Sequence, residues 1–120
     1  MKSYTDIEQS KKLAEILPIE SADMIYMPMM DIDSMSNSGF FNIPECYPFN
    51  EFKDSDTKPL PCWSLAALMN ILDRGALFVT PQGWACQSYI NFKAITSDHH
   101  SNPIDACYEI ILRLHELKML

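Results

Sequence analysis

Glycine and basic residues are both scarce in this chain of 120 residues. Only three glycines occur, and there is no Gly-x-Gly-x-x-Gly, Walker A or Gly-x-Ser-x-Gly run, so nothing indicates a glycine-rich phosphate cradle or a nucleophile elbow. Nine basic residues against sixteen acidic ones give a net charge of −7 and leave no basic patch to neutralise phosphates. The sequence therefore predicts no nucleic-acid partner and no membrane partner.

Long apolar runs are also missing. None approaches the ~18 residues of a membrane-spanning helix, and the first residues lead into a charged segment instead of the apolar core of a signal peptide. The four cysteines lie 16, 24 and 21 positions apart and form no Cys-x-x-Cys pair. They are Cys46, Cys62, Cys86 and Cys107. We expect a cytoplasmic protein with separate, reduced thiols, no metal and no cofactor.

The composition is otherwise that of a folded domain. Hydrophobic residues make up 48% of the chain and charged residues 21%, which favours one globular domain over residues 1–120. The acidic excess is one-sided: residues 1–60 hold eleven acids and five bases, and residues 61–120 hold five acids and four bases. Residues 1–60 therefore present either a solvated acidic face or a surface for a basic partner.

A helix is predicted near each end. Residues 5–17 have an amphipathic pattern, Thr5 and Glu8 have capping-box spacing, and Pro18 ends the helix. Near the other end, Asn102 as N-cap and Pro103 at the first helical position predict a helix that runs to Leu117.

The middle of the chain predicts a third helix and a hairpin. Residues 62–72 are apolar nearly all round the helical wheel, so we expect a helix buried on every side, with Gly75 as its left-handed cap. Residues 80–83, with Pro81 second and Gly83 fourth, fit a turn between strands at 76–79 and 84–90. A short strand is expected at 23–27, and residues 31–61 read as an irregular segment with one strand near 40–43. These elements predict an α+β fold in which the N-terminal, buried central and C-terminal helices pack on one small antiparallel sheet.

Three stretches resemble small proteins encoded by phages and mobile elements of gut bacteria. They are TDIEQSKKLAEILP with ESADM at residues 5–18 and 20–24, PCWSLAAL at residues 61–68, and NPIDACYEII at residues 102–111, continuing to Leu117. The resemblance implies a prophage or mobile-element setting and a cytoplasmic product. It implies no activity and no catalytic residue.

One enzymatic alternative comes from Cys62, at the predicted start of the central helix. A cysteine at a helix N-terminus can have a lowered pKa and act as a nucleophile, with His99, His100 or His115 as a general base. However, Pro61 departs from the residues that precede the nucleophile in papain-like proteases, and no orienting Asn or Asp is matched. A small cysteine hydrolase is therefore the alternative function.

The interaction hypothesis depends on surface residues. Tyr108 and Leu112, four residues apart and off the main apolar stripe of the last helix, form a compact patch, unless the segment 31–61 covers it. Five of the eight methionines fall between residues 24 and 35, which favours adaptable packing in the core or against a partner over a copper site. We expect a non-enzymatic accessory protein that binds a protein partner or itself.

Overall fold

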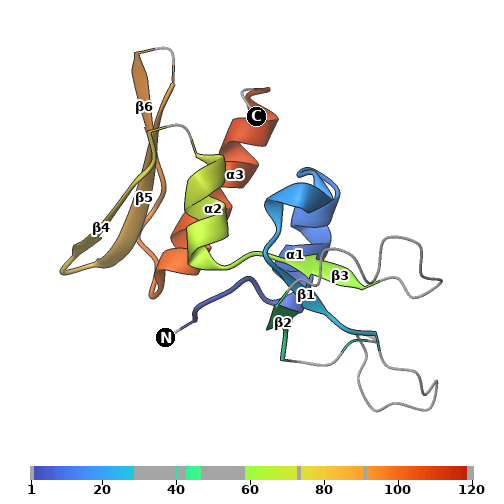
Figure 1. The fold of residues 1–120 in the computed structure, drawn as a ribbon. Coiled ribbons are helices and arrows are strands. Elements are labelled where there is room, and N and C mark those ends of the chain that lie inside the picture. The colour runs from blue at the N-terminus through green and yellow to red at the C-terminus, as the bar shows by residue number, and fades with distance from the viewer. Residues whose placement is uncertain are drawn as a thin grey trace. The chain divides into compact units, whose positions relative to one another are not determined.

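The computed structural model describes residues 2–28, 40, 43–46, 59–72, 74–90 and 92–118. It divides into two compact units, Met1–Thr5 with Ser64–Leu120, and Asp6–Trp63. The predicted α+β class is confirmed, because the described residues form α-helices and antiparallel sheets (Figure 1). The strands form two three-stranded sheets, one in each unit, where the sequence predicted one sheet.

The sheet of the first unit is built from consecutive hairpins. Its strands β4 (Ala76–Thr80), β5 (Gly83–Ile90) and β6 (Lys93–Thr96) pair in chain order, and Thr80 faces Gly83 across the turn that the sequence predicts. Gly83 has φ of 130°, and a Cβ there would lie 2.5 Å from the carbonyl oxygen of His100. Only glycine fits this position without strain, because that backbone conformation excludes side chains.

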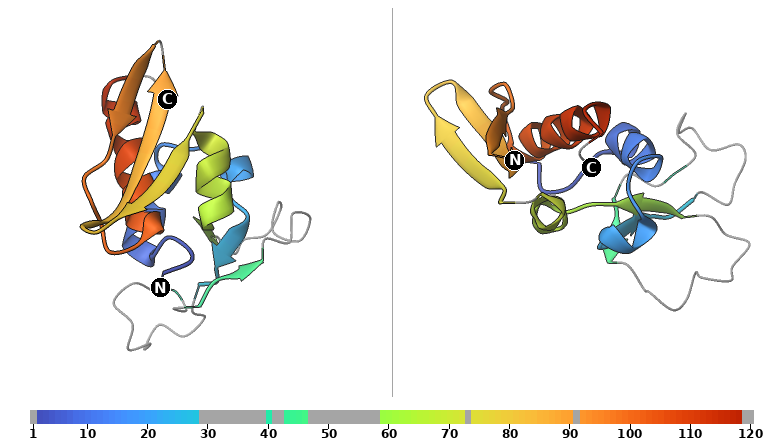
Figure 2. Two further views of the ribbon diagram at one scale, coloured as in Figure 1. Left: turned by 90° about the vertical axis from the view of Figure 1, so that its left-hand side faces the viewer. Right: turned by 90° about the horizontal axis from the view of Figure 1, so that it is seen from above.

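Helix α3 (Pro103–Glu116) packs along this sheet, against β5 (Figure 2). The predicted cap is confirmed, since the side chain of Asn102 accepts a hydrogen bond of 2.9 Å from the backbone N–H of Asp105. The helix ends at Glu116, one residue before the predicted end at Leu117. The buried residues of the helix are Pro103, Ile104, Ala106, Cys107, Ile110, Ile111 and Leu114.

Helix α2 (Leu65–Ile71) is shorter than predicted. Its N-cap is Ser64, whose Oγ accepts the N–H of Ala67 at 3.3 Å, so residues 62–63 are not helical. The expected burial on every side is also wrong, because Ala66 is exposed while Ala67 is buried. Two apolar residues that widened the predicted stripe, Cys62 and Trp63, lie outside the helix.

The turn after α2 also differs from the prediction. Arg74 has φ of 50° and takes the left-handed position, whereas Gly75 does not have a positive φ. The left-handed residue therefore lies one position before the glycine that the sequence indicated.

The second unit contains α1 (Ile7–Ala14), the 3-10 helix η1 (Ile19–Ser21) and the strands β1 (Met24–Tyr26), β2 (Glu45–Cys46) and β3 (Leu60–Cys62). The strand predicted at 23–27 is confirmed as β1, the centre of an antiparallel sheet ordered β2-β1-β3. Helix α1 packs on β3. The core of this unit includes the fully buried side chains of Leu13, Ile25 and Trp63.

The cap of α1 is shifted by one residue from the prediction. Asp6, not Thr5, is the N-cap: its carboxylate accepts the N–H of Gln9 at 2.7 Å, and the Gln9 side chain accepts the N–H of Asp6 at 3.1 Å. Thr5 is fully buried. The capping box exists, with the neighbouring acid instead of Thr5 at its first position.

Part of the irregular segment lies outside the described residues. Phe40 forms an isolated bridge with Pro28, but residues 41–42 of the strand expected near 40–43 are not described. Met29, Met30 and Met35 of the methionine cluster are also outside them. Within the ranges that the structure describes, no helix is long and apolar enough to cross a membrane.

Candidate functional site

Cys62 does not stand at a helix N-terminus as predicted. It is the last residue of β3, fully buried, in the unit of residues 6–63. The cause is tertiary: Cys62 pairs with Met24 of β1 across the sheet, which holds it in an extended conformation. The suggested bases belong to the other unit, where His99 and His115 are exposed and His100 is half-buried. A pairing of Cys62 with any of them stays a prediction.

His100 contacts a carboxylate, Glu109 on α3. Its Nε2 lies 2.7 Å from Oε1 of Glu109, and the backbone N–H of Asp98 donates to both Glu109 oxygens at 3.1 and 3.3 Å. Arg113, one turn later, lies 2.9 Å from Oε2 of Glu109 and donates to the carbonyl of Thr96 at 3.0 Å. We call Glu109, His100, Asp98 and Arg113 the Glu109 cluster.

The charge of Glu109 is stabilised within this cluster. Burial alone would raise the pKa of its carboxyl, but the hydrogen bonds from His100 and the Asp98 backbone and the charge of Arg113 together hold the pKa below its ordinary value of 4.5. Both oxygens are used to fasten the segment after β6 to α3. Glu109 therefore orients the ring of His100, and its carboxylate has a structural role.

The predicted interaction pair on α3 is only partly exposed. Tyr108 and Leu112 are both half-buried, so they form a smaller patch than the sequence indicates. Their role in binding stays a prediction.

A cluster of sulfur atoms lies in the core of the same unit, between β5, α3 and α2. The Sγ of Cys107 is 3.5 Å from the Sγ of Cys86 and 3.6 Å from the Sδ of Met69. Both cysteines are fully buried and reduced. The expectation that the thiols are separate is wrong for this pair. The sequence held a usable signal, because Cys107 falls on the predicted apolar stripe of the helix and Cys86 in the predicted hairpin.

The two thiols are not equivalent. The Sγ of Cys107 lies within hydrogen-bond distance of the Sγ of Cys86, and this interaction lowers the pKa of Cys86 and raises the pKa of Cys107. Burial raises the pKa of both thiols, and a hydrogen bond from the backbone N–H of Gln87 further favours the Cys86 thiolate. Cys86 is therefore the more nucleophilic sulfur of the pair.

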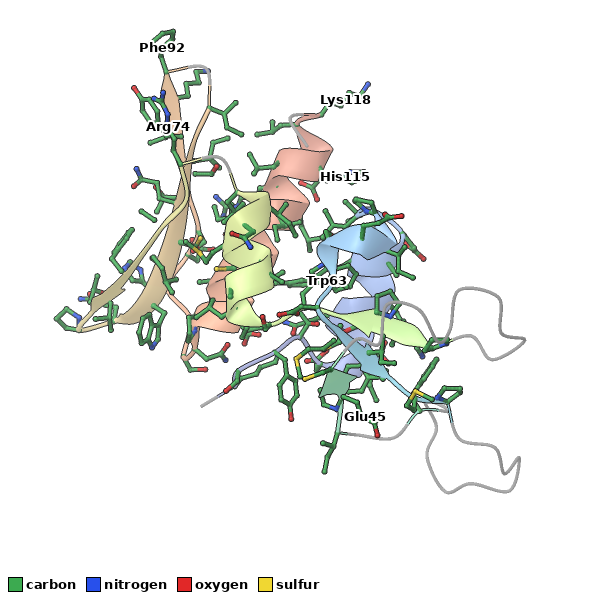
Figure 3. All side chains as sticks on the ribbon, in the orientation of Figure 1. Glu45, Trp63, Arg74, Phe92, His115 and Lys118 are labelled. Carbon is green, nitrogen blue, oxygen red and sulfur yellow. The ribbon has the colours of Figure 1, made fainter. Side chains whose placement is uncertain are left out.

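The third feature is the free edge of the β4-β5-β6 sheet. Strand β4 pairs only with β5 among the described residues, and it carries no charged side chain. Val79 in this strand is 63% exposed. Phe92, 91% exposed, lies away from this edge at the tip of the β5–β6 hairpin (Figure 3).

Other kinds of site find less support. In the part of the chain that the structure describes, no group of three or more His, Cys, Asp or Glu side chains is arranged to hold a metal ion. No family model, curated protein or solved structure matches the chain.

Proposed function

We propose that this chain is a non-enzymatic interaction protein, an accessory product of a phage or mobile element, that pairs with a second copy of itself through strand β4. The observation that carries the proposal is the edge of that strand, which has no charged side chain and, among the described residues, pairs with β5 alone. Natural sheets usually blunt such edges with lysine, proline or a bulge. The phage or mobile-element setting is supported by the three resembling sequence stretches.

The other edge of the same sheet has two of these protective features, a lysine and a bulge. Strand β6 begins with Lys93. Between the pairs Gln87–Thr96 and Trp84–His100, three residue steps along β5 face four steps along its partner, so the partner segment contains a bulge. Strand β4 has no charged side chain, and its register with β5 is continuous from Ala76 to Thr80 without a bulge, which favours it as the docking edge among the described strands of this sheet.

Backbone groups of β4 are available for pairing. The N–H and C=O of Trp84 both bond to His100, and those of Cys86 bond to Ser97, so neither residue bonds to β4. Val79 lies opposite Trp84, and Leu77 lies opposite Cys86. In an antiparallel sheet the N–H and C=O of one residue point to the same side, so those of Leu77 and Val79 point to the open edge.

These groups define a symmetric register. If two β4 strands pair antiparallel about Phe78, Leu77 of each copy exchanges both backbone hydrogen bonds with Val79 of the other, and the two Phe78 side chains meet on the axis. Every cross-strand pair is then uncharged, and the central ones are apolar or aromatic, which stabilises a sheet pair. The result is a six-stranded sheet across a twofold axis.

Charge also favours a second copy. The whole chain carries −7, but residues 61–120, which include this sheet, hold five acids and four bases and so carry only −1. Two copies can therefore meet at this edge with little repulsion at close range. A strongly basic partner would find no complementary charge on β4.

The test is the molar mass in solution, by light scattering coupled to size exclusion at two concentrations in reducing buffer. We expect a concentration-dependent dimer. Val79→Pro removes one donor per copy, hence two hydrogen bonds of about 1 kcal/mol each across the dimer, and should weaken association about 30-fold. A wild-type protein that stays monomeric at both concentrations would refute self-pairing.

A charge swap tests the register itself. Phe78→Lys and Phe78→Glu should each be monomeric, because like charges would meet on the twofold axis, and the two variants mixed should form a heterodimer. Phe92→Ser is the control for general stickiness and should leave the dimer unchanged. If instead Tyr108→Ala with Leu112→Ala gives monomers while the Phe78 variants stay dimeric, α3 carries the interface and the β4 assignment is wrong.

A further inference from the structure

We propose that Cys86 and Cys107 form a modification site, an oxidisable dithiol that a hydroperoxide converts into a disulfide joining β5 to α3. The inference does not depend on pairing through β4. It starts from the 3.5 Å separation of the two sulfur atoms, which come from different elements and face one another in the core. Closing that gap to a disulfide bond of ~2 Å requires a local shift of about 1.5 Å.

The surroundings of the two sulfur atoms suggest their roles. A negative charge on Cys86 can be stabilised by two donors, the Cys107 thiol at 3.5 Å and the backbone N–H of Gln87, so we assign Cys86 as the attacking sulfur. In the first step, the Cys86 thiolate attacks one oxygen of hydrogen peroxide, the O–O bond breaks, and Cys86 becomes a sulfenic acid while hydroxide leaves. In the second, the Cys107 sulfur attacks the Cys86 sulfur, the S–O bond breaks, and the Cys107 proton leaves with the oxygen as water. Overall two thiols lose two hydrogens and one peroxide gives two waters.

The surroundings select the reagent and favour the closed product. Both residues have no exposed surface, so small uncharged oxidants reach them more readily than bulky or charged thiol reagents. The resolving thiol is already in contact with Cys86, so a sulfenic acid there is captured before further oxidation. Cys46, the exposed cysteine of β2, lacks this enclosure and should react directly with bulky reagents.

The experiment treats the full chain, carrying Cys46→Ser to suppress disulfides between molecules, with hydrogen peroxide under native conditions. Intact mass spectrometry should show the loss of two hydrogen atoms, and two of the three remaining thiols should resist alkylation after unfolding. Peptide mapping should join the Cys86 peptide to the Cys107 peptide, and dithiothreitol should restore all three thiols. A cross-link to Cys62, an unchanged thiol count, or oxygen addition without a cross-link would overturn the proposal.

Variants separate the two roles. In Cys107→Ser the cross-link is lost, and a cyclic 1,3-diketone present while the oxidised chain is unfolded should label a sulfenic acid on Cys86. In Cys86→Ser neither the cross-link nor the label on Cys107 should form. Equal labelling of the two single variants would remove the assignment of Cys86 as the attacking sulfur. Because the mass and mapping readouts are made on a chain with both cysteines intact, a variant that fails to fold leaves the main test standing.

Discussion

The two sheets of this protein are assembled in different ways. Strands β4, β5 and β6 follow one another in sequence, whereas the sheet β2-β1-β3 joins segments that are distant along the chain, with Met24 facing both Cys46 and Cys62. The first sheet has strands of four to eight residues, and the second has strands of two or three. The pairing of strands in a hairpin is specified by the local turn residues, whereas the pairing of strands that are distant in sequence depends on tertiary contacts.

The largest expected effect compares the cores behind the two sheets. Ile110 of α3 and Ile25 of β1 are both fully buried, so truncation to alanine should cost each about 2–5 kcal/mol of unfolding free energy. Ile110→Ala should lie near the upper end, because a 14-residue helix packed on the central strand collapses less readily into the cavity than a three-residue strand does. Urea unfolding measures both. An equal or larger loss for Ile25→Ala would show the short sheet to be the more rigid.

A second prediction breaks the local hairpin at its turn. Gly83→Ala places a Cβ against the His100 carbonyl in a backbone conformation that side chains avoid, and should cost about 2–3 kcal/mol. It should also break the Trp84–His100 backbone pair, seen as faster amide exchange at both residues. Gly75→Ala is the comparison: its added Cβ would lie 2.8 Å from the Cβ of Leu72, but Gly75 has no positive φ, so the loss should be smaller than that of Gly83→Ala. Equal losses would mean that the turn geometry is not what Gly83 supplies.

The smallest expected effect concerns acid. The pKa of Glu109 in the folded protein lies below its ordinary value of 4.5, so at acidic pH the unfolded state binds more protons at this residue than the folded state does. The stability that this charge contributes is present above pH 4.5 and is lost as the pH falls through the folded pKa. Glu109→Gln keeps much of the shape but not the charge, so urea unfolding should show a loss of about 1 kcal/mol or less at pH 7 that shrinks toward pH 3.

Glu15 of the other unit provides the matched control for that experiment. It forms an exposed pair with Lys12 at 3.9 Å, so Glu15→Gln should leave the unfolding profile nearly unchanged. A pH-independent loss in Glu109→Gln would mean that the residue acts through packing, not through its charge.

The sequence correctly predicted the elements that are specified by residues close to them in the chain. Asn102 and Pro103 start α3 where expected, and Pro81 and Gly83 bracket the hairpin turn. Ser64 is a local signal too, but the helix was expected to begin at residue 62, so Ser64 fell inside it and was not identified as its N-cap. Where a nearby acid competed with a threonine for the cap of α1, sequence spacing alone did not decide, because the burial of Thr5 is a tertiary fact.

The sequence by itself determined the α+β class, the hairpin and the capped last helix, because turn and cap preferences act over a few residues. Only the tertiary structure decided that Cys62 is a strand residue, that the strands form two sheets, and that Cys86 meets Cys107. Each of these depends on contacts between segments 20 or more residues apart. Pairing of β1 with β3 overrides the apolar helical pattern at Cys62, and packing of β5 on α3 closes the distance between two thiols that the sequence keeps apart.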